Sequence, residues 1–156
     1  MPLATRMSVV SEIMPSRKAI SLRLDRTPSV LEAVNLMIAN KVGSVVVLDA
    51  DGSPRGIITE RDVLKKVTKA GKSPSEIAVQ DIMSHPVVTV KPFDSIDTAA
   101  AIMTKNKIKR LVVLEQDGTF TGMLSITDIT RKLSKILTDD YLRFGHLKAM
   151  IDLIDY

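Results

Sequence analysis

The pattern of apolar and polar positions along the chain predicts short strands and helices in regular alternation. Short apolar runs bounded by polar or turn-forming residues indicate strands at 19–22, 45–48, 87–90 and 111–114. The runs at 45–48 and 111–114 consist only of Val and Leu. We therefore expect these two strands to be buried on both faces.

A helix is predicted between the first and second strand of each set. Ser29 is followed three residues later by Glu32, which is a capping-box pattern for a helix start. In the second set, Asp94 or Ser95 is the predicted cap. Apolar residues then recur at helical spacing on one stripe of each helix: Val30, Val34, Met37 and Ile38, and Ile96, Ala100 and Met103.

Two tight turns follow the buried strands. Asp51-Gly52 and Asp117-Gly118 predict hairpins, because Gly accepts the positive φ that such turns require. The elements after the turns are return strands at 56–58 and 122–124, and second helices that begin at Thr59 and at Ser125.

The two sets of elements are copies of one another. Residues 30–67 align without a gap with residues 96–133, and 12 of the 38 aligned positions are identical. Upstream, Asp81-Ile82-Met83 corresponds to Glu12-Ile13-Met14, with three extra residues in the first copy. A unit of about 60 residues is too small to bury much surface alone. We therefore expect the two copies to pack together.

The repeated unit predicts an α+β fold. We expect two tandem β-α-β-β-α repeats packed with pseudo-two-fold symmetry, each a small sheet with helices on one face. Helix-breaking residues at 70–74 separate the copies. The predicted boundaries are 8–72 for the first repeat, 77–137 for the second, and 138–156 for a C-terminal helical extension.

The composition fits a globular, cytoplasmic protein. Apolar residues make up 45% of the 156 positions, and there is no cysteine, which excludes disulfides and cysteine-based metal sites. No apolar run approaches the ~18 residues of a membrane span, and no secretory signal is evident. We expect no membrane partner. The net charge of +4 permits an anionic ligand without demanding nucleic acid.

The start of each second helix carries the same candidate chemistry. A Gly, two apolar residues, a hydroxyl residue, two further residues and an Asp recur as Gly56, Thr59 and Asp62, and as Gly122, Ser125 and Asp128. The first N–H groups of a helix suit a phosphate, and a nearby carboxylate can accept from two ribose hydroxyls. The same pattern is also a capping box. Because it occurs twice, in register behind the same strand, we favour a nucleotide site, and the two roles can coexist.

These features resemble a known family, the CBS-domain pair, which is often called a Bateman module. The resemblance covers about residues 10–137 and is carried by the segments 56–62 and 122–128. It implies that the motif hydroxyl meets a phosphate and that the Asp holds the ribose hydroxyls. It also implies an apolar pocket for the base around the first strands, at Ala19 and Ile20 and at Pro86, Val87 and Val88.

Basic residues near the motifs distinguish the two copies. Lys109 and Arg110 precede the buried strand of copy two, where copy one has Gly43 and Ser44. In proteins similar to this one, a His or Arg at that position contacts phosphate, and an Arg can do so with two hydrogen bonds. Arg61 lies inside the first motif and can reach a phosphate too. The alternatives are a solvent-facing ion pair for Arg110 and an ordinary surface role for Arg61.

The resemblance implies a regulatory, energy-sensing module that is not an enzyme. The expected ligand is an adenine nucleotide (AMP, ADP or ATP) or a related adenosyl compound such as S-adenosylmethionine, bound in the cleft between the repeats. No other cofactor is expected, and the signal would pass to a regulated partner protein that the sequence does not identify. We also expect a homodimer, because helix faces carrying Met37, Ile38 and Met103 offer more apolar surface than one small sheet needs.

Other functions have less support in the sequence. His85 and His146 lie outside any metal-ligand spacing, so no metal site is predicted. No Ser–His–acid set, phosphate-binding loop or dinucleotide fingerprint is present, which argues against an enzyme. The alternative is a DNA- or RNA-associated regulator that uses the basic excess and the C-terminal segment. Four aspartates between positions 139 and 155 argue against it.

Overall fold

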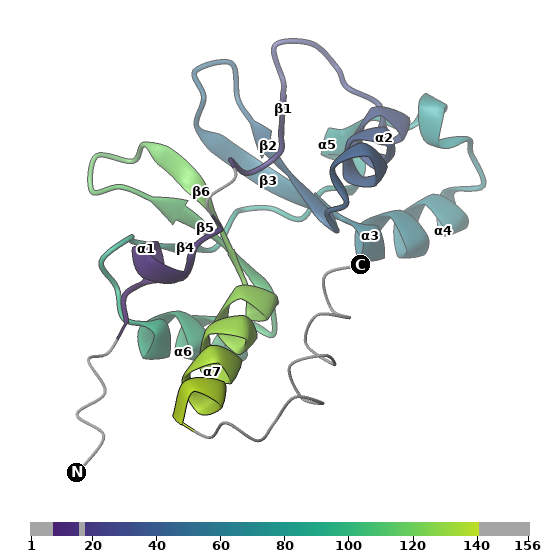
Figure 1. Cartoon of the computed structure of the whole chain (residues 1–156). Coiled ribbons are helices and arrows are strands. Elements are labelled where there is room, and N and C mark those ends of the chain that lie inside the picture. The colour runs from purple at the N-terminus through teal and green to yellow at the C-terminus, as the bar shows by residue number, and fades with distance from the viewer. Residues whose placement is uncertain (1–7, 16–17, 141–156) are drawn as a thin grey trace. The chain divides into compact units, whose positions relative to one another are not determined.

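The chain folds as two compact units, each a small sheet with its own helices (Figure 1). The computed structural model describes residues 8–15 and 18–140. The first-repeat unit consists of residues 18–88 and 117–121, and the second-repeat unit consists of residues 8–15, 89–116 and 122–140. The predicted α+β class with two repeated units is confirmed. Of the predicted C-terminal extension at 138–156, residues 138–140 continue the second helix of the second repeat, α7 (Ile126–Asp140), and residues 141–156 lie outside the described residues.

The sheet of the first-repeat unit has three strands in the order β1-β2-β3. The central strand, β2 (Ser44–Leu48), is buried along its whole length, as its run of apolar residues predicts. It pairs in parallel with β1 (Ser21–Arg23) and antiparallel with β3 (Pro54–Thr59). The hairpin between β2 and β3 turns at Gly52, whose φ of 88° only glycine adopts readily.

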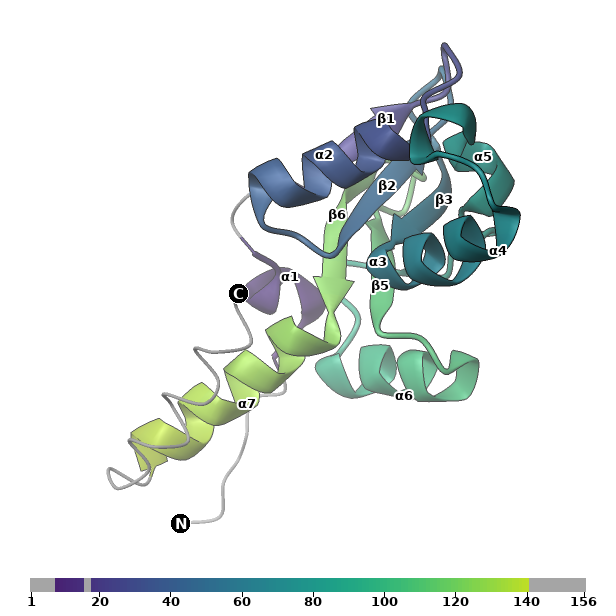
Figure 2. The ribbon, with the colours of Figure 1, turned by 90° about the vertical axis from the view of Figure 1, so that its right-hand side faces the viewer.

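Helix α2 (Val30–Asn40) begins with the predicted capping box. The Ser29 hydroxyl accepts from the backbone N–H of Glu32 at 3.3 Å, and the Glu32 carboxylate accepts from the Ser29 N–H at 2.8 Å. Val30, Ala33 and Met37 are buried, because they lie on the stripe that faces the core. Figure 2 shows α2 lying on one face of the β1–β2–β3 sheet.

The second helical segment of the first-repeat unit leads directly out of β3. It starts as α3 (Glu60–Asp62), continues as a π-helical stretch, η1 (Val63–Val67), and ends as α4 (Thr68–Ala70). The segment stops at Gly71, which has a left-handed φ of 63°. The helix breakers at 70–74 therefore act where the sequence predicted, but the π-helical stretch has no signal in the sequence.

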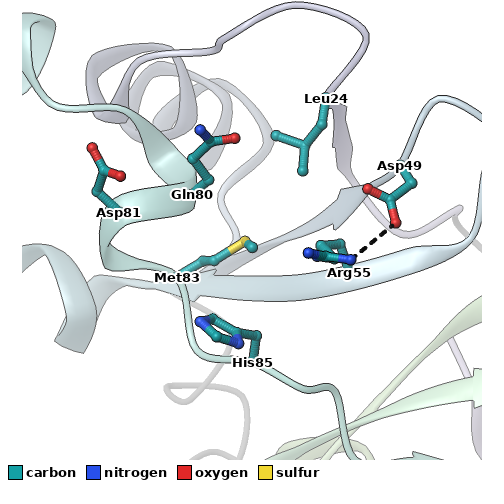
Figure 3. A pocket seen from close by; sticks show the side chains of 7 residues that line it. All are labelled: Leu24, Asp49, Arg55, Gln80, Asp81, Met83 and His85. Carbon is teal, nitrogen blue, oxygen red and sulfur yellow. Dashed lines mark ion pairs between the residues drawn. The ribbon is translucent and has the colours of Figure 1, made fainter.

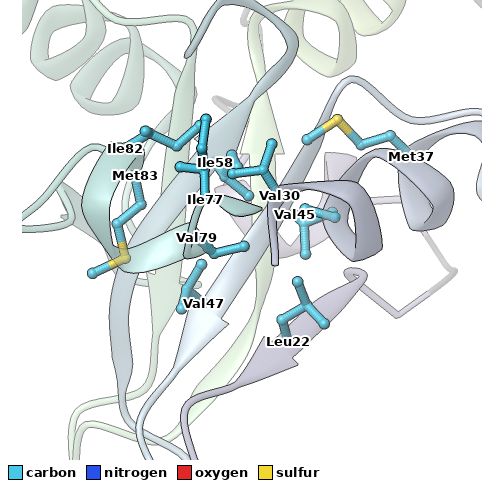
Figure 4. Packing of buried hydrophobic residues seen from close by; sticks show 11 residues of the cluster. Leu22, Val30, Met37, Val45, Val47, Ile58, Ile77, Val79, Ile82 and Met83 are labelled. Atoms are coloured by element: carbon cyan, nitrogen blue, oxygen red, sulfur yellow. The ribbon is translucent and has the colours of Figure 1, made fainter. Parts of the chain in front are cut away.

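The core of the first-repeat unit recruits side chains from beyond the repeat (Figure 4). Residues of β2 and β3 supply its centre, and Val45, Val47 and Ile58 are fully buried. Ile77 and Val79, which the sequence analysis assigned to the second repeat, are buried in the same cluster. The cluster consists of Leu22, Val30, Ala33, Met37, Val45, Val47, Ile58, Ile77, Val79, Ile82 and Met83.

The second-repeat unit has the same topology. Its strands are ordered β4-β5-β6, and β4 runs parallel to β5. The Ser95 hydroxyl caps the first helix by accepting from the Thr98 N–H at 3.0 Å, which decides between the two predicted caps. The elements of the second repeat are β4 (Thr89–Val90), α6 (Ile96–Asn106), β5 (Arg110–Leu114), β6 (Phe120–Ser125) and α7 (Ile126–Asp140), and the first two residues of β6 are assigned to the first-repeat unit.

The compact units do not follow the boundaries 8–72 and 77–137 predicted from the repeat. Helix α1 (Val10–Ile13), which precedes the first repeat, belongs to the second-repeat unit, where it packs against α7. Helix α5 (Val79–Ile82) follows a short 3₁₀ turn, η2 (Pro74–Glu76), and packs against β3 and η1 of the first-repeat unit. Each leading segment is therefore exchanged between the two copies.

Equivalent backbone hydrogen bonds fix the two exchanged segments. In the first-repeat unit, the N–H of Val79 donates to the carbonyl of Pro28 at 2.9 Å. In the second-repeat unit, the N–H of Val10 donates to the carbonyl of Asp94 at 2.9 Å. Val10 and Val79 are both completely buried. The repeat thus extends to the contacts that anchor each leading segment.

One expectation about exposed apolar surface is wrong. Met37 and Met103 are only 5% and 4% exposed, and Met37 belongs to the core cluster of the first-repeat unit. They offer no surface to a second copy. Ile38, by contrast, is 70% exposed, since it lies one position round the helix from Met37.

Candidate functional site

The first motif forms a complete capping box where β3 meets α3. The carboxylate oxygen Oδ2 of Asp62 accepts from the backbone N–H of Thr59 at 3.0 Å and from the Thr59 hydroxyl at 2.9 Å. The Thr59 Oγ1 in turn accepts from the Asp62 N–H at 3.2 Å. The Glu60 N–H donates to the carbonyl of Gly43 at 3.1 Å, which ties the helix start to the residue before β2.

The second motif repeats this geometry where β6 meets α7. Oδ2 of Asp128 accepts from the N–H and the hydroxyl of Ser125, both at 2.8 Å. The Asp128 N–H donates to Ser125 Oγ at 3.2 Å, and the Ile126 N–H donates to the carbonyl of Lys109 at 2.9 Å. The structure therefore brings together both hydroxyl–carboxylate pairs that the sequence singled out, and in each the side chains cap the helix.

Both motif aspartates are buried, at 8% exposure for Asp62 and 9% for Asp128. A buried carboxylate needs hydrogen-bond donors, because it has lost its water. The capping box supplies two donors to Oδ2 of each Asp. The partners of Oδ1 then decide how much of each carboxylate a ligand can use.

The two copies differ at this Oδ1 atom. Asp62 Oδ1 accepts from the Ser84 hydroxyl at 3.2 Å and pairs with the Lys66 ammonium at 3.0 Å. Asp128 Oδ1 meets a guanidinium nitrogen of Arg131 at 3.4 Å. Sequence analysis missed Ser84 and Lys66. Lys66 lies four residues after Asp62, which is a detectable spacing, whereas Ser84 is 22 residues away.

Each motif glycine lies under a methionine from the exchanged segment. A Cβ on Gly56 would lie 2.6 Å from the sulfur of Met83 and 3.0 Å from the carbonyl oxygen of Ser84. A Cβ on Gly122 would meet the terminal methyl of Met14. Neither glycine has a positive φ, so their shared requirement is close packing. Met14 and Met83 occupy equivalent places in the repeat.

A family model described as CBS domain matches residues 10–69 and 79–135 of this chain. The chain belongs to the CBS-domain family. The two matched segments contain both capping-box motifs, and together they cover most of the residues described above.

Curated relatives are similar to about two thirds of this chain. An uncharacterized protein of Methanopyrus kandleri is 37% identical over 103 residues, which is 66% of this chain and 53% of that protein. The chain spans about half the length of this relative and of the CBS domain-containing protein CBSX3 of Arabidopsis thaliana. It spans a quarter of the length of an uncharacterized protein of Methanocaldococcus jannaschii. The likeness therefore covers only part of each of these relatives.

Solved structures of CBS proteins match the fold and include bound adenosyl compounds. A CBS domain protein of Pyrobaculum aerophilum, complexed with AMP, has a TM-score of 0.70 and 28% identity, covering 78% of this chain and 89% of that one. The CBS domain pair of protein MJ0100, in complex with 5′-methylthioadenosine and S-adenosyl-L-methionine, has a TM-score of 0.70 and 25% identity, covering 81% of this chain and 99% of that one.

The remaining candidate residues differ in their exposure to solvent. Arg61 is exposed on α3 and Lys109 is exposed before β5, while Arg110 is the half-buried first residue of β5. The five residues expected around a base lie just before β1 and β4. Ala19, Ile20, Val87 and Val88 are half-buried, and Pro86 is exposed.

A pocket of about 490 Å³ opens at the other end of β3 (Figure 3). Arg55 at its rim pairs with Asp49 at 3.8 Å. Arg55 directly precedes Gly56, and Met83, which also lines the pocket, is the methionine that packs over that glycine. Because Arg55 is four residues before Thr59, it lies about 13 Å along the strand from the hydroxyl–carboxylate pair. Its lining mixes both charge signs, and we do not assign the ligand to it. The lining residues are Leu24, Asp49, Arg55, Gln80, Asp81, Met83 and His85.

In the part of the chain that the structure describes, no group of three or more His, Asp or Glu side chains is placed to hold a metal ion. His85 lines the pocket, and His146 lies outside the described residues. None of the helices within residues 8–15 and 18–140 is long and apolar enough to span a membrane.

Proposed function

We propose that this CBS pair is a regulatory module that binds an adenosyl ligand at its two motifs. The observation that carries the proposal is the repeated pair of a hydroxyl and a buried carboxylate at a helix start, Thr59 with Asp62 and Ser125 with Asp128. The AMP, methylthioadenosine and S-adenosylmethionine complexes of similar CBS proteins support this ligand class. AMP, ADP, ATP and S-adenosylmethionine are the candidates.

Each half of the motif matches one part of such a ligand. The ribose hydroxyls would donate to the ionised Asp carboxylate, which can accept hydrogen bonds but cannot donate them. A phosphate would meet the motif hydroxyl and the positive end of the helix. Arg110 and Lys109 would add charge at copy two, and Arg61 at copy one, since hydrogen bonds between charged groups are about twice as strong as neutral ones.

The module would act by changing its shape or rigidity on binding, which a partner protein then reads. This role needs no catalytic group, and the chain's resemblance is to CBS pairs rather than to a catalytic domain. We also propose that two copies of the chain associate. Ile38 on α2 and Leu64 on η1 are 70% and 72% exposed. These exposed apolar side chains support an interface with the second copy on the first-repeat unit.

Calorimetric titration tests the ligand class. The purified protein is titrated with AMP, ADP, ATP and S-adenosylmethionine, after mass spectrometry of any small molecule that it retains. We expect at least one of them to bind with a Kd in the micromolar range, roughly −7 to −8 kcal/mol. A double variant, Asp62→Ala with Asp128→Ala, should lose this heat. Absence of heat and of a thermal shift with all four compounds would reject the proposal.

A further inference from the structure

The carboxylate of Asp62 has all of its acceptor positions filled by the protein itself. An ionised carboxylate offers about four lone-pair positions. Two of these positions on Asp62 accept hydrogen bonds from the N–H and the hydroxyl of Thr59. The other two accept from the Ser84 hydroxyl and the Lys66 ammonium. A ribose that donates two hydrogen bonds to Asp62 must therefore displace existing partners.

Asp128 in copy two is less fully occupied. Its cap is the same, but the further contact is one guanidinium nitrogen of Arg131 at 3.4 Å, on a side chain that is 45% exposed. Pro15 follows Met14 where Ser84 follows Met83, and a proline has neither a hydroxyl nor an N–H to donate. This difference between the copies therefore follows from one sequence position, which is Ser84 in copy one and Pro15 in copy two.

Lys66 and Ser84 also join the motif to the exchanged segment. The Lys66 ammonium donates to the carbonyl of Ile82 at 2.6 Å as well as to Asp62. Ser84 is bonded to β3 through its backbone, since it exchanges two N–H···O bonds with Ile57 at 3.0 and 2.8 Å. Asp62, Lys66 and Ser84 form what we call the clasp, which ties α3 and η1 to residues 82–84.

We propose that Lys66 and Ser84 set the ligand preference between the two CBS motifs. Resting on the adenosyl-binding function proposed above, the inference is that the clasp makes copy one the weaker ribose site. Copy two, without a counterpart of Ser84, binds the ribose first. A ligand that does enter copy one opens the clasp and frees residues 82–84 from the helical segment.

Adenosine is the probe that isolates this effect. It carries the ribose but no phosphate, so the loss of the Lys66 charge does not change a phosphate contact. In an Asp128→Ala background, remaining binding reports on copy one. We expect Ser84→Ala with Lys66→Met to tighten adenosine binding in that background by about tenfold, because two hydrogen bonds no longer compete for Asp62. Lys69→Met, at an exposed lysine of α4, is the charge-matched control and should change nothing.

The outcomes separate this inference from the proposed function. If the unmodified protein binds no adenosyl compound, the function itself is rejected. If the unmodified protein binds and the clasp variant shows no gain, or a loss, only the preference is overturned. Asp128→Asn, which keeps an oxygen for the cap, replaces Asp128→Ala if that variant does not fold.

Hydrogen exchange tests the clasp without any ligand. Removing the Lys66 and Ser84 side-chain bonds should raise amide exchange at residues 82–88 of the free protein, and Lys69→Met should not. In the Asp128→Ala protein, saturating adenosine should raise exchange in the same segment. Unchanged exchange in both experiments would show that the three side chains hold nothing in place.

Discussion

The Glu32 carboxylate sits where a helix start and an arginine both favour its charge. The N–H of Ser29, and then Arg26, hold the pKa of Glu32 below its ordinary value of 4.5. The Arg26 guanidinium lies 2.6 Å from the carboxylate. Because the side chain is largely solvated, the effect is a modest one and is sensitive to salt.

The lowered pKa gives this capping box a defined dependence on pH. Above the unfolded pKa, the folded protein gains from the ionised Glu32, and this gain is lost as the pH falls through the lower, folded pKa. Glu32→Gln should therefore be less stable than the parent at pH 7, and the difference in stability should shrink as the pH falls below 4.5 and through the lower, folded pKa. Urea unfolding of both proteins over a series of pH values measures this. A difference that stays constant as the pH falls would show that the carboxylate charge is not its source.

The two motif glycines should tolerate substitution unequally. At Gly56 a new Cβ meets the sulfur of Met83 and a backbone carbonyl, whereas at Gly122 it meets only the mobile end of Met14. We expect Gly56→Ala to lower the free energy of unfolding by about 1–3 kcal/mol, and Gly122→Ala by less. Thermal or urea unfolding decides between these outcomes. Equal losses would mean that Met14 cannot move aside.

At this scale the sequence reveals local pairs and misses distant ones. Thr59 and Asp62 are three residues apart, so their pairing follows from the geometry of any helix start. The bond from Ser84 to Asp62 spans 22 residues and depends on where the exchanged segment packs. No local pattern encodes that placement, and the clasp was therefore not predicted.

Among the elements, the exchanged segments α1 and α5 have the most direct effect on stability. Val10→Ala and Val79→Ala each remove two methyl groups from a fully buried position, which should cost about 1–3 kcal/mol. The location of the loss is the sharper prediction. Val10→Ala should raise hydrogen exchange in α6 and α7, and Val79→Ala should raise it in α2 and β3.

The pair of variants serves as its own control. If each valine instead protected the repeat that follows it along the chain, the two exchange patterns would be swapped. That result would contradict the exchange of segments. Both variants are expected to keep the capping boxes at Thr59 and Ser125, because neither valine contacts them through a hydrogen bond.

The first helix of each repeat and the two buried strands were predicted from the sequence, whereas the short helices α1 and α5 were not. The start of α2 and the extent of β2 follow from local signals, a capping box and an apolar run. β1 and β4 are shorter than predicted and shifted toward their C-terminal ends, because they pair at one edge only. Met37 was expected at a dimer interface but is buried in the core. Hydrophobic periodicity shows that a helix face is apolar, but it does not show whether that face packs inside the chain or against a second copy.

For the whole molecule, the exposed apolar residues predict association of two copies. Light scattering at tens of micromolar should give the mass of a dimer. Ile38→Asp should shift the mass toward the monomer, because a charge would be buried at the contact. Asn35→Asp, at an exposed polar position of the same helix, is the matched control. A monomer mass for the unmodified protein would refute the dimer.

The exchange of leading segments also determines how a gene for this protein can be divided. A break in the loop after α4 would separate α5 from the first-repeat unit and α1 from the second-repeat unit, which would uncover the surfaces of β3 and η1 and of α7 against which they pack. A coding fragment for residues 18–88 keeps every strand and helix of the first-repeat unit, and lacks only the hairpin residues 117–121. A fragment moved between proteins should therefore follow the compact unit, which starts and ends later in the chain than the repeat at 8–72 that the sequence shows.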